Sequence, residues 1–294
     1  MYRILLIVFS VILGSAFGSF ACCQAWRIRL KEKGKKDPGK RSVCLKCGKK
    51  LTWYENIPII SWLLQGGKCR KCGEKIGKAE IIAEVFGAVG FGLITWNFVA
   101  GIDGNLGIIE FIGALDLGGL VAVLAAMVGM IILMVYDGKW GEMPVGILIY
   151  TIVMGLVFAV VEAVGKSYEW IPCPEGAQCI SAGSYGFSFG LLLQNCLPVL
   201  GSVALLAGTY YLLYFFSKEK LVGGGDWMLC LAIGLILGKW ELALAELFLS
   251  NFLGAIAMLP QRKKKMAFGP FLVIAFVIVL VFSEPLIKAL AMNF

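Results

Sequence analysis

Residues 118–136 read GGLVAVLAAMVGMIILMVY, an apolar run without a charge that ends directly before Asp137. A helix needs about 20 such residues to cross the hydrocarbon core of a membrane. The same criterion predicts further spans near 4–25, 80–100, 144–164, 187–216, 227–238, 240–259 and 268–290. The chain has 294 residues and is 59% hydrophobic, which is typical of a polytopic membrane protein. We therefore expect an all-α membrane protein with about eight transmembrane helices.

Positive charge is concentrated in one segment. Residues 26–79 carry 16 of the 27 Lys and Arg and only four acidic residues, so their net charge is +12, whereas the rest of the chain is −4. Beside a membrane span such a bias is typical of the cytoplasmic side rather than of nucleic-acid binding. Eight crossings then place the N- and C-termini outside. The basic block after the first span predicts an uncleaved helix rather than a signal peptide.

This pattern predicts three regions. Residues 1–25 form the first transmembrane helix, residues 26–79 a cytoplasmic lobe, and residues 80–294 a bundle of seven helices in the lipid bilayer.

Two CxxC pairs lie in the predicted lobe, separated by 21 residues. They are Cys44-Leu45-Lys46-Cys47 and Cys69-Arg70-Lys71-Cys72. Four thiolates at this spacing are typical of a zinc site whose tetrahedral shell is closed to substrate. We therefore predict a structural zinc ion in a zinc-ribbon-like fold. A disulfide between Cys173 and Cys179, on the predicted outer side, is left open.

Two aspartates lie at predicted span ends on the cytoplasmic side. Asp137 closes the third span, and Asp226 follows Gly223-Gly224-Gly225. Two carboxylates brought together can share a proton, so that one acts as a base toward water and the other as an acid toward the leaving amine. The chain contains no His, which excludes imidazole-dependent proteases and a His-ligated catalytic metal. An interfacial anchor is the alternative for Asp137, and Glu84 is a weaker site candidate.

These motifs in this order resemble the type IV prepilin peptidase family. The resemblance rests on Gly223-Gly224-Gly225-Asp226, Asp137 before Pro144, Gly18-Ser19-Phe20 with Arg27, and Phe268-Gly269-Pro270-Phe271. The two CxxC pairs, the block from Glu55 to Leu63 between them, and Glu84 complete it, so that it covers nearly the whole chain.

The resemblance implies a bacterial inner-membrane enzyme with two activities. It would cleave the leader of type IV prepilins or type II secretion pseudopilins on the cytoplasmic side, with Asp137 and Asp226 as catalytic residues. It would then methylate the new N-terminus with S-adenosylmethionine. No glycine-rich nucleotide loop marks where this methyl donor binds, and the oligomeric state and exact substrate are not indicated by the sequence.

Three departures from the family pattern stand out. Ala21-Cys22-Cys23 follows Gly-Ser-Phe where Asn is usual, Lys78-Ala79-Glu80 replaces a Tyr-Pro element, and Val145 replaces Asp after Pro144. None involves Asp137 or Asp226. The first two lie in the half of the chain that the resemblance links to methylation, so methylation is less strongly implied than cleavage.

Two alternatives remain at this point. One is another Gly-x-Gly-Asp protease that cuts within the bilayer, which would not predict the cysteine lobe. The other is a non-catalytic membrane scaffold whose zinc lobe docks a partner, which predicts that Asp137 and Asp226 face apart.

Overall fold

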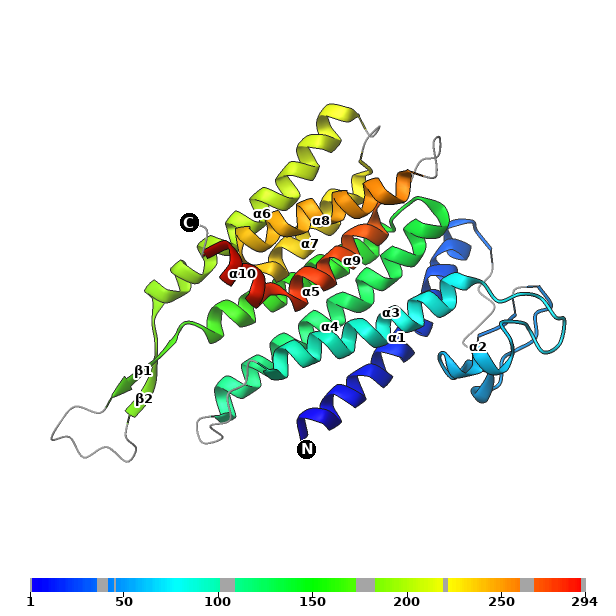
Figure 1. Cartoon of the computed structure of the whole chain (residues 1–294), viewed down its shortest axis with the longest axis horizontal. Coiled ribbons are helices and arrows are strands. Elements are labelled where there is room, and N and C mark those ends of the chain that lie inside the picture. The colour runs from blue at the N-terminus through cyan, green and yellow to red at the C-terminus, as the bar shows by residue number, and fades with distance from the viewer. Residues whose placement is uncertain are drawn as a thin grey trace.

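The computed structural model describes residues 2–35, 42–44, 46–100, 109–172, 183–218, 222–259 and 267–291. Long helices run side by side, with a small lobe around α2 at one end of the bundle and a β-hairpin at the other (Figure 1). The lobe follows α1 (Tyr2–Glu32) and precedes α3 (Lys78–Ala100), and it contains a 3-10 helix at Trp53–Asn56 and α2 (Ile60–Leu64).

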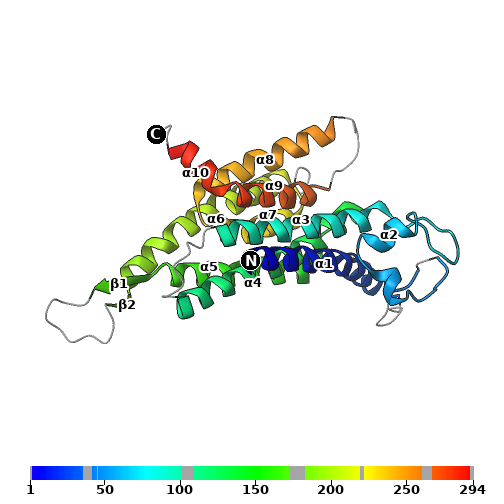
Figure 2. The same ribbon diagram turned by 60° about the horizontal axis from the view of Figure 1, so that its bottom comes forward.

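The remaining elements follow in chain order. They are α4 (Ile109–Trp140), α5 (Val145–Gly165), β1 (Tyr168–Pro172), β2 (Gly183–Phe187), α6 (Phe189–Ser217), α7 (Gly224–Leu237), α8 (Trp240–Met258), α9 (Gly269–Val281) and α10 (Ser283–Ala291). Figure 2 shows α1, α4 and α5 on one side of the bundle and α8 on the opposite side.

The predicted all-helical membrane architecture is confirmed. Six described helices are long and apolar enough to cross a membrane, and α7 and α9 are shorter apolar helices at two further predicted positions. The predicted span 268–290 is not one helix, because it breaks at Phe282 between α9 and α10. The antiparallel β1–β2 hairpin, which pairs Tyr168 with Phe187, was not predicted either.

Helices α1 and α3 pack backbone against backbone. A Cβ at Gly14 would lie 2.2 Å from the carbonyl oxygen of Gly87, and one at Gly18 would lie 2.3 Å from that of Ala83. Small residues four apart permit this approach between helices in a membrane, where van der Waals packing replaces the hydrophobic effect. The Gly-Ser-Phe element therefore fixes α1 against the start of α3.

Helix α4 is the central helix of the bundle. Its side chains at Met127, Met130, Ile131 and Leu133 are completely buried. It packs against α1, α3, α5 and α9, and its last turn reaches the end of the bundle at which the lobe lies (Figure 1). This packing fixes the position of Asp137.

Candidate functional site

Asp137 lies in the last turn of α4 and is 6% exposed. Its Oδ2 accepts a 2.8 Å hydrogen bond from the amide of Gly269, the first residue of α9. A Cβ at Gly269 would lie 2.9 Å from that same oxygen and 2.5 Å from Cε of Met143. Only glycine therefore brings the start of α9 this close to the carboxylate.

Asp226 lies in the first turn of α7 and is also 6% exposed. Its Oδ2 accepts a 2.8 Å hydrogen bond from the amide of Gly223, which caps the helix. A Cβ at the neighbouring Gly225 would lie 2.7 Å from Cβ of Met143. Met143 thus contacts both Gly225, which precedes Asp226, and Gly269, which binds Asp137.

The two aspartates share a neighbour. They lie 89 positions apart in sequence, yet Met143 contacts both Gly225, next to Asp226, and Gly269, which binds Asp137. The end of α4 and the start of α7 lie at the same end of the bundle as the lobe (Figure 1).

The four predicted cysteines form one cluster. The Sγ atoms of Cys44, Cys47, Cys69 and Cys72 all lie within 4.8 Å of one another, and those of Cys44 and Cys72 are 3.8 Å apart. Thiolates around a tetrahedral ion with bonds of about 2.3 Å are roughly 3.8 Å apart. This group could hold a metal ion.

Both halves of the cluster use the same turn. The amide of Gly48 donates to the carbonyl of Cys44, and the amide of Gly73 donates to that of Cys69, each at 2.9 Å. Both glycines have positive φ angles, 66° and 68°, which other residues rarely adopt. The equivalent turns present each CxxC pair to the common centre.

Glu55 organises the segment between the two pairs. Its buried carboxylate accepts hydrogen bonds from Nζ of Lys49 at 2.6 Å and from the amide of Thr52 at 3.1 Å. The bond with Lys49 and that with the Thr52 amide lower the pKa of Glu55 to about 2. Glu55 is therefore an ionised anchor inside the lobe.

Glu84 joins the lobe to the bundle. Its Oε2 accepts a 2.7 Å hydrogen bond from the amide of Ile59, a residue with a positive φ of 61°. Positive φ is strained for a β-branched residue, and the bond to Glu84 helps to hold it. Glu84, which the sequence indicated only as a weaker site candidate, thus binds the Glu55–Leu63 block.

Sequence reasoning missed the polar network at the end of α4. Lys139 pairs with Glu80 of α3 at 2.6 Å, and Arg29 of α1 pairs with Glu142 at 2.6 Å. The hydroxyl of Tyr136 donates to Glu32. No motif in the sequence identifies such pairs, because their members lie 59 to 113 positions apart.

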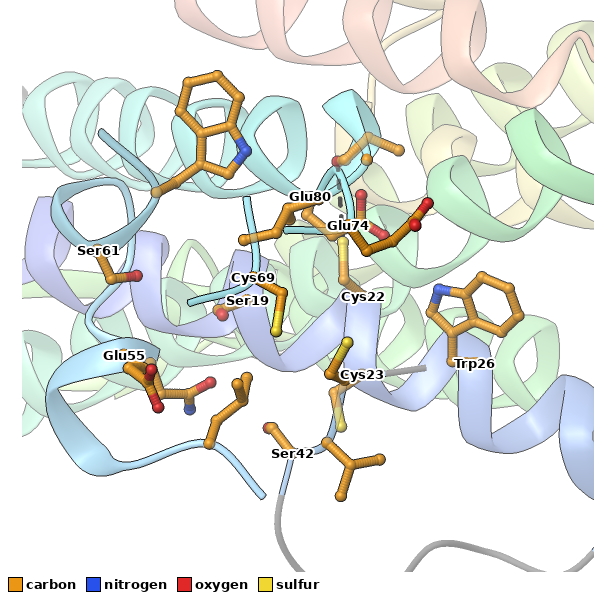
Figure 3. A pocket seen from close by; sticks show the side chains of 18 of the residues that line it. Ser19, Cys22, Cys23, Trp26, Ser42, Glu55, Ser61, Cys69, Glu74 and Glu80 are labelled. Carbon is orange, nitrogen blue, oxygen red and sulfur yellow. Dashed lines mark hydrogen bonds between the residues drawn. The ribbon is translucent and has the colours of Figure 1, made fainter. Parts of the chain in front are cut away.

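A cavity lies between α1, the lobe and the start of α3 (Figure 3). Glu55, Glu84 and Lys139 all line it, whereas Asp137 and Asp226 do not.

Two predictions are not resolved by this geometry. Cys173 and Cys179 lie outside the described residues, and the catalytic role of the aspartates stays a prediction.

Comparison with known proteins bears on the same residues. The sequence model of the Bacterial Peptidase A24 N-terminal domain matches residues 12–98. A Vibrio cholerae protein named prepilin leader peptidase/N-methyltransferase is 42% identical over 85 residues, which are 29% of this chain and 34% of that relative. A protein of that name from Neisseria gonorrhoeae is 29% identical over 243 residues, covering 80% of this chain and 68% of the relative. The chain is thus similar to prepilin leader peptidases over most of its length.

Together, these sequence matches cover both the cysteine lobe and the two aspartates. The matched residues 12–98 contain most of α1, the lobe and most of α3. The Pseudomonas aeruginosa relative is 24% identical over 254 residues, 84% of this chain and 73% of its own length. A continuous match of that extent includes Asp137 and Asp226 wherever it begins. No solved structure matches the chain.

Proposed function

We propose that this protein removes the leader peptide of type IV prepilins or type II secretion pseudopilins and then methylates the new N-terminus. The observation that carries the first activity is the pair of buried aspartates on α4 and α7, whose neighbouring glycines both contact Met143. The names of the relatives support both activities.

The hydrolytic step needs one base and one acid. Asp137 and Asp226 each use Oδ2 to accept a backbone amide, which leaves Oδ1 available to water and substrate. One carboxylate takes a proton from water as that water attacks the scissile carbonyl, and the other, protonated, gives its proton to the departing amine. Two acids that share one proton can supply both roles.

The methylation step forms a nitrogen–carbon bond on the freed amine. S-adenosylmethionine supplies a methyl group on a sulfonium, whose carbon–sulfur electron pair stays on sulfur. The amine must lose its ammonium proton before it attacks, so a carboxylate near the donor would accept that proton. Glu80 and Glu84 line the cavity between the lobe and α3 and could do so.

The four cysteines would hold a structural zinc ion. Cys44, Cys47, Cys69 and Cys72 supply a full tetrahedral set, and such a closed shell has no position for a catalytic water. The zinc would stabilise the lobe that the hydrogen bond between the Ile59 amide and Glu84 joins to the bundle.

The lobe and the aspartates would face the cytoplasm, with the N- and C-termini on the other side of the inner membrane. The basic residues of segment 26–79 support this orientation through the positive-inside rule. The start of α1 and α10 both point away from the lobe (Figure 1). Leader removal would then occur on the cytoplasmic side.

The test is incubation of the purified protein with a prepilin and labelled methyl donor, followed by mass measurement of the product N-terminus. Asp137→Asn and Asp226→Asn should each abolish cleavage. Asp116→Asn is the matched control, because Asp116 is an exposed acid on the same helix α4 and should leave cleavage unchanged. Cleavage by either active-site variant would exclude the aspartate pair, and a cleaved but unmethylated wild-type product would exclude the second activity.

A further inference from the structure

Met143 lies in the turn that joins α4 to α5, and its side chain contacts the starts of two other helices. A Cβ at Gly225 of α7 would lie 2.7 Å from Cβ and 2.9 Å from Sδ of Met143. A Cβ at Gly269 of α9 would lie 2.5 Å from its Cε. The base of the methionine side chain therefore rests on α7, and its tip rests on α9.

Each of these helix starts is tied to one aspartate. Gly225 directly precedes Asp226, and the amide of Gly269 donates to Oδ2 of Asp137 at 2.8 Å. Because both contacts are with glycine, Met143 packs on backbone, which cannot rotate away as a side chain can. A change in the length of side chain 143 therefore acts on the position of α7, of α9 or of both.

The turn that carries Met143 is fixed to the end of α4. The amide of Gly141 donates to the carbonyl of Asp137 at 2.7 Å, and its φ of 68° is the left-handed conformation that commonly ends a helix. Pro144, with a φ of −70°, is the N-cap residue of α5. Only Glu142 and Met143 lie between this glycine and this proline, so the backbone of Met143 has a defined position relative to Asp137.

Helix α1 restrains the same turn through Arg29. Its Nη1 donates to the carboxylate of Glu142 at 2.6 Å, and its guanidinium lies over the rings of Tyr136 and Trp140, 5.9 and 5.6 Å from their centroids. The Glu142 side chain is 61% exposed, so this pair contributes little to stability. A guanidinium held by two rings nevertheless gives the carboxylate a fixed place to bind. The residue next to Met143 is thus held from α1.

The proposed hydrolysis depends on the separation of the two aspartates. A base and an acid must both reach the same water and peptide, within about 3 Å. Misplacement of reacting groups by about 1 Å can lower a rate roughly a hundredfold. Asp137 and Asp226 stand on different helices, so their separation is set by the side chains that pack against those helix ends.

We propose that Met143 is a positioning residue that sets the separation of Asp137 and Asp226, and that the Arg29–Glu142 pair holds it in place. This inference rests on the proposed cleavage activity and adds to its site a residue that exchanges no proton, because a thioether carries none. Met143 acts on the rate of the chemical step through the two helix starts.

The experiment measures kcat and KM for prepilin cleavage by purified full-length variants. Met143→Ala removes both Sδ and Cε, so kcat should fall roughly ten- to hundredfold while KM stays the same. Met154→Ala is the matched control, because Met154 is also a partly buried methionine packed on the core, but it lies within α5. It should keep the wild-type kcat. A kcat of Met143→Ala equal to that of the control would overturn the proposal.

A second variant covers the case in which Met143→Ala does not fold. Met143→Leu keeps the volume of the side chain, so the fold should tolerate it, but leucine ends before the position of Cε and reaches only Gly225. Its kcat should lie between those of the wild type and Met143→Ala. A wild-type kcat in Met143→Leu would show that contact with Gly269 does not position the aspartates, and would overturn the proposal.

The role of the ion pair is tested by a double-mutant cycle. Glu142→Gln should lower kcat up to about fivefold, and it should have no further effect in Met143→Ala, because the pair acts through Met143. An unchanged kcat in Glu142→Gln, or independent effects of the two substitutions, would overturn that role. If the wild type cleaves prepilin while these variants match it, only this inference fails. If the wild type does not cleave, the proposed first activity fails as well.

Discussion

The amide of Gly269 binds Oδ2 of Asp137 at 2.8 Å across 132 positions of sequence. The first amides of a helix have no partner within the helix, and the helix dipole places partial positive charge at this end. Helix α9 therefore offers its N-terminus to the carboxylate that closes α4. This contact gives the Phe268-Gly269-Pro270-Phe271 element a physical role.

We predict that Gly269→Ala impairs leader cleavage. The added methyl would lie 2.9 Å from Asp137 Oδ2 and 2.5 Å from Met143 Cε, so α9 must move and the hydrogen bond is lost. A hydrogen bond to a charged group contributes about 1.5–3 kcal/mol, which corresponds to a roughly ten- to hundredfold lower cleavage rate. Gly208→Ala, in open space on α6, should cleave prepilin at the wild-type rate. Equal rates for both variants would mean that Gly269 does not position Asp137.

The sequence could predict the elements of the site but not their tertiary partners. Apolar runs locate the helices. Asp137 and Asp226 each stand at the end of a predicted span on the predicted cytoplasmic side, and Asp226 directly follows three glycines. The four cysteines follow from their spacing alone. The bonds of Gly269 with Asp137 and of Lys139 with Glu80 depend on which helices pack together, and no local pattern encodes this.

We predict that Gly18→Ala destabilises the protein. A methyl at this position would lie 2.3 Å from the Ala83 carbonyl oxygen on α3, and backbone on both sides cannot yield without separating the helices. Overpacking of this kind costs about 1–3 kcal/mol. The thermal unfolding midpoint in detergent should fall, whereas Gly146→Ala, which meets no atom within 4 Å, should leave it unchanged. A midpoint equal to that of the wild type would show that α1 and α3 do not require this close approach.

We predict that the purified protein carries one zinc ion per chain and that Cys44→Ser loses it. A serine oxygen is a poor substitute for one of the four clustered thiolates, and a structural zinc contributes folding energy directly. Metal content measured by atomic absorption should fall, while Cys196→Ser, in α6 and outside the cluster, should retain the metal. Unchanged zinc in the Cys44 variant would refute the metal assignment. Cleavage alone cannot test it, because the lobe is joined to the bundle through Glu84.

We predict that Glu55→Gln weakens the lobe in a pH-dependent way. The bond with Lys49 lowers the pKa of Glu55 from 4.5 to about 2, so ionised Glu55 contributes stability above about pH 4.5. That contribution is lost as the pH falls from 4.5 through 2, because the folded state then has to take up the proton that the unfolded state already binds. Glutamine does not titrate, so the unfolding midpoints of the variant and the wild type should differ fully at pH 6 and converge toward pH 2. The metal content of both proteins is measured at each pH, because release of the metal would unfold the lobe and remove the difference by itself. A difference in midpoint that stays constant over the whole range would show that the charge of Glu55 does not stabilise the lobe.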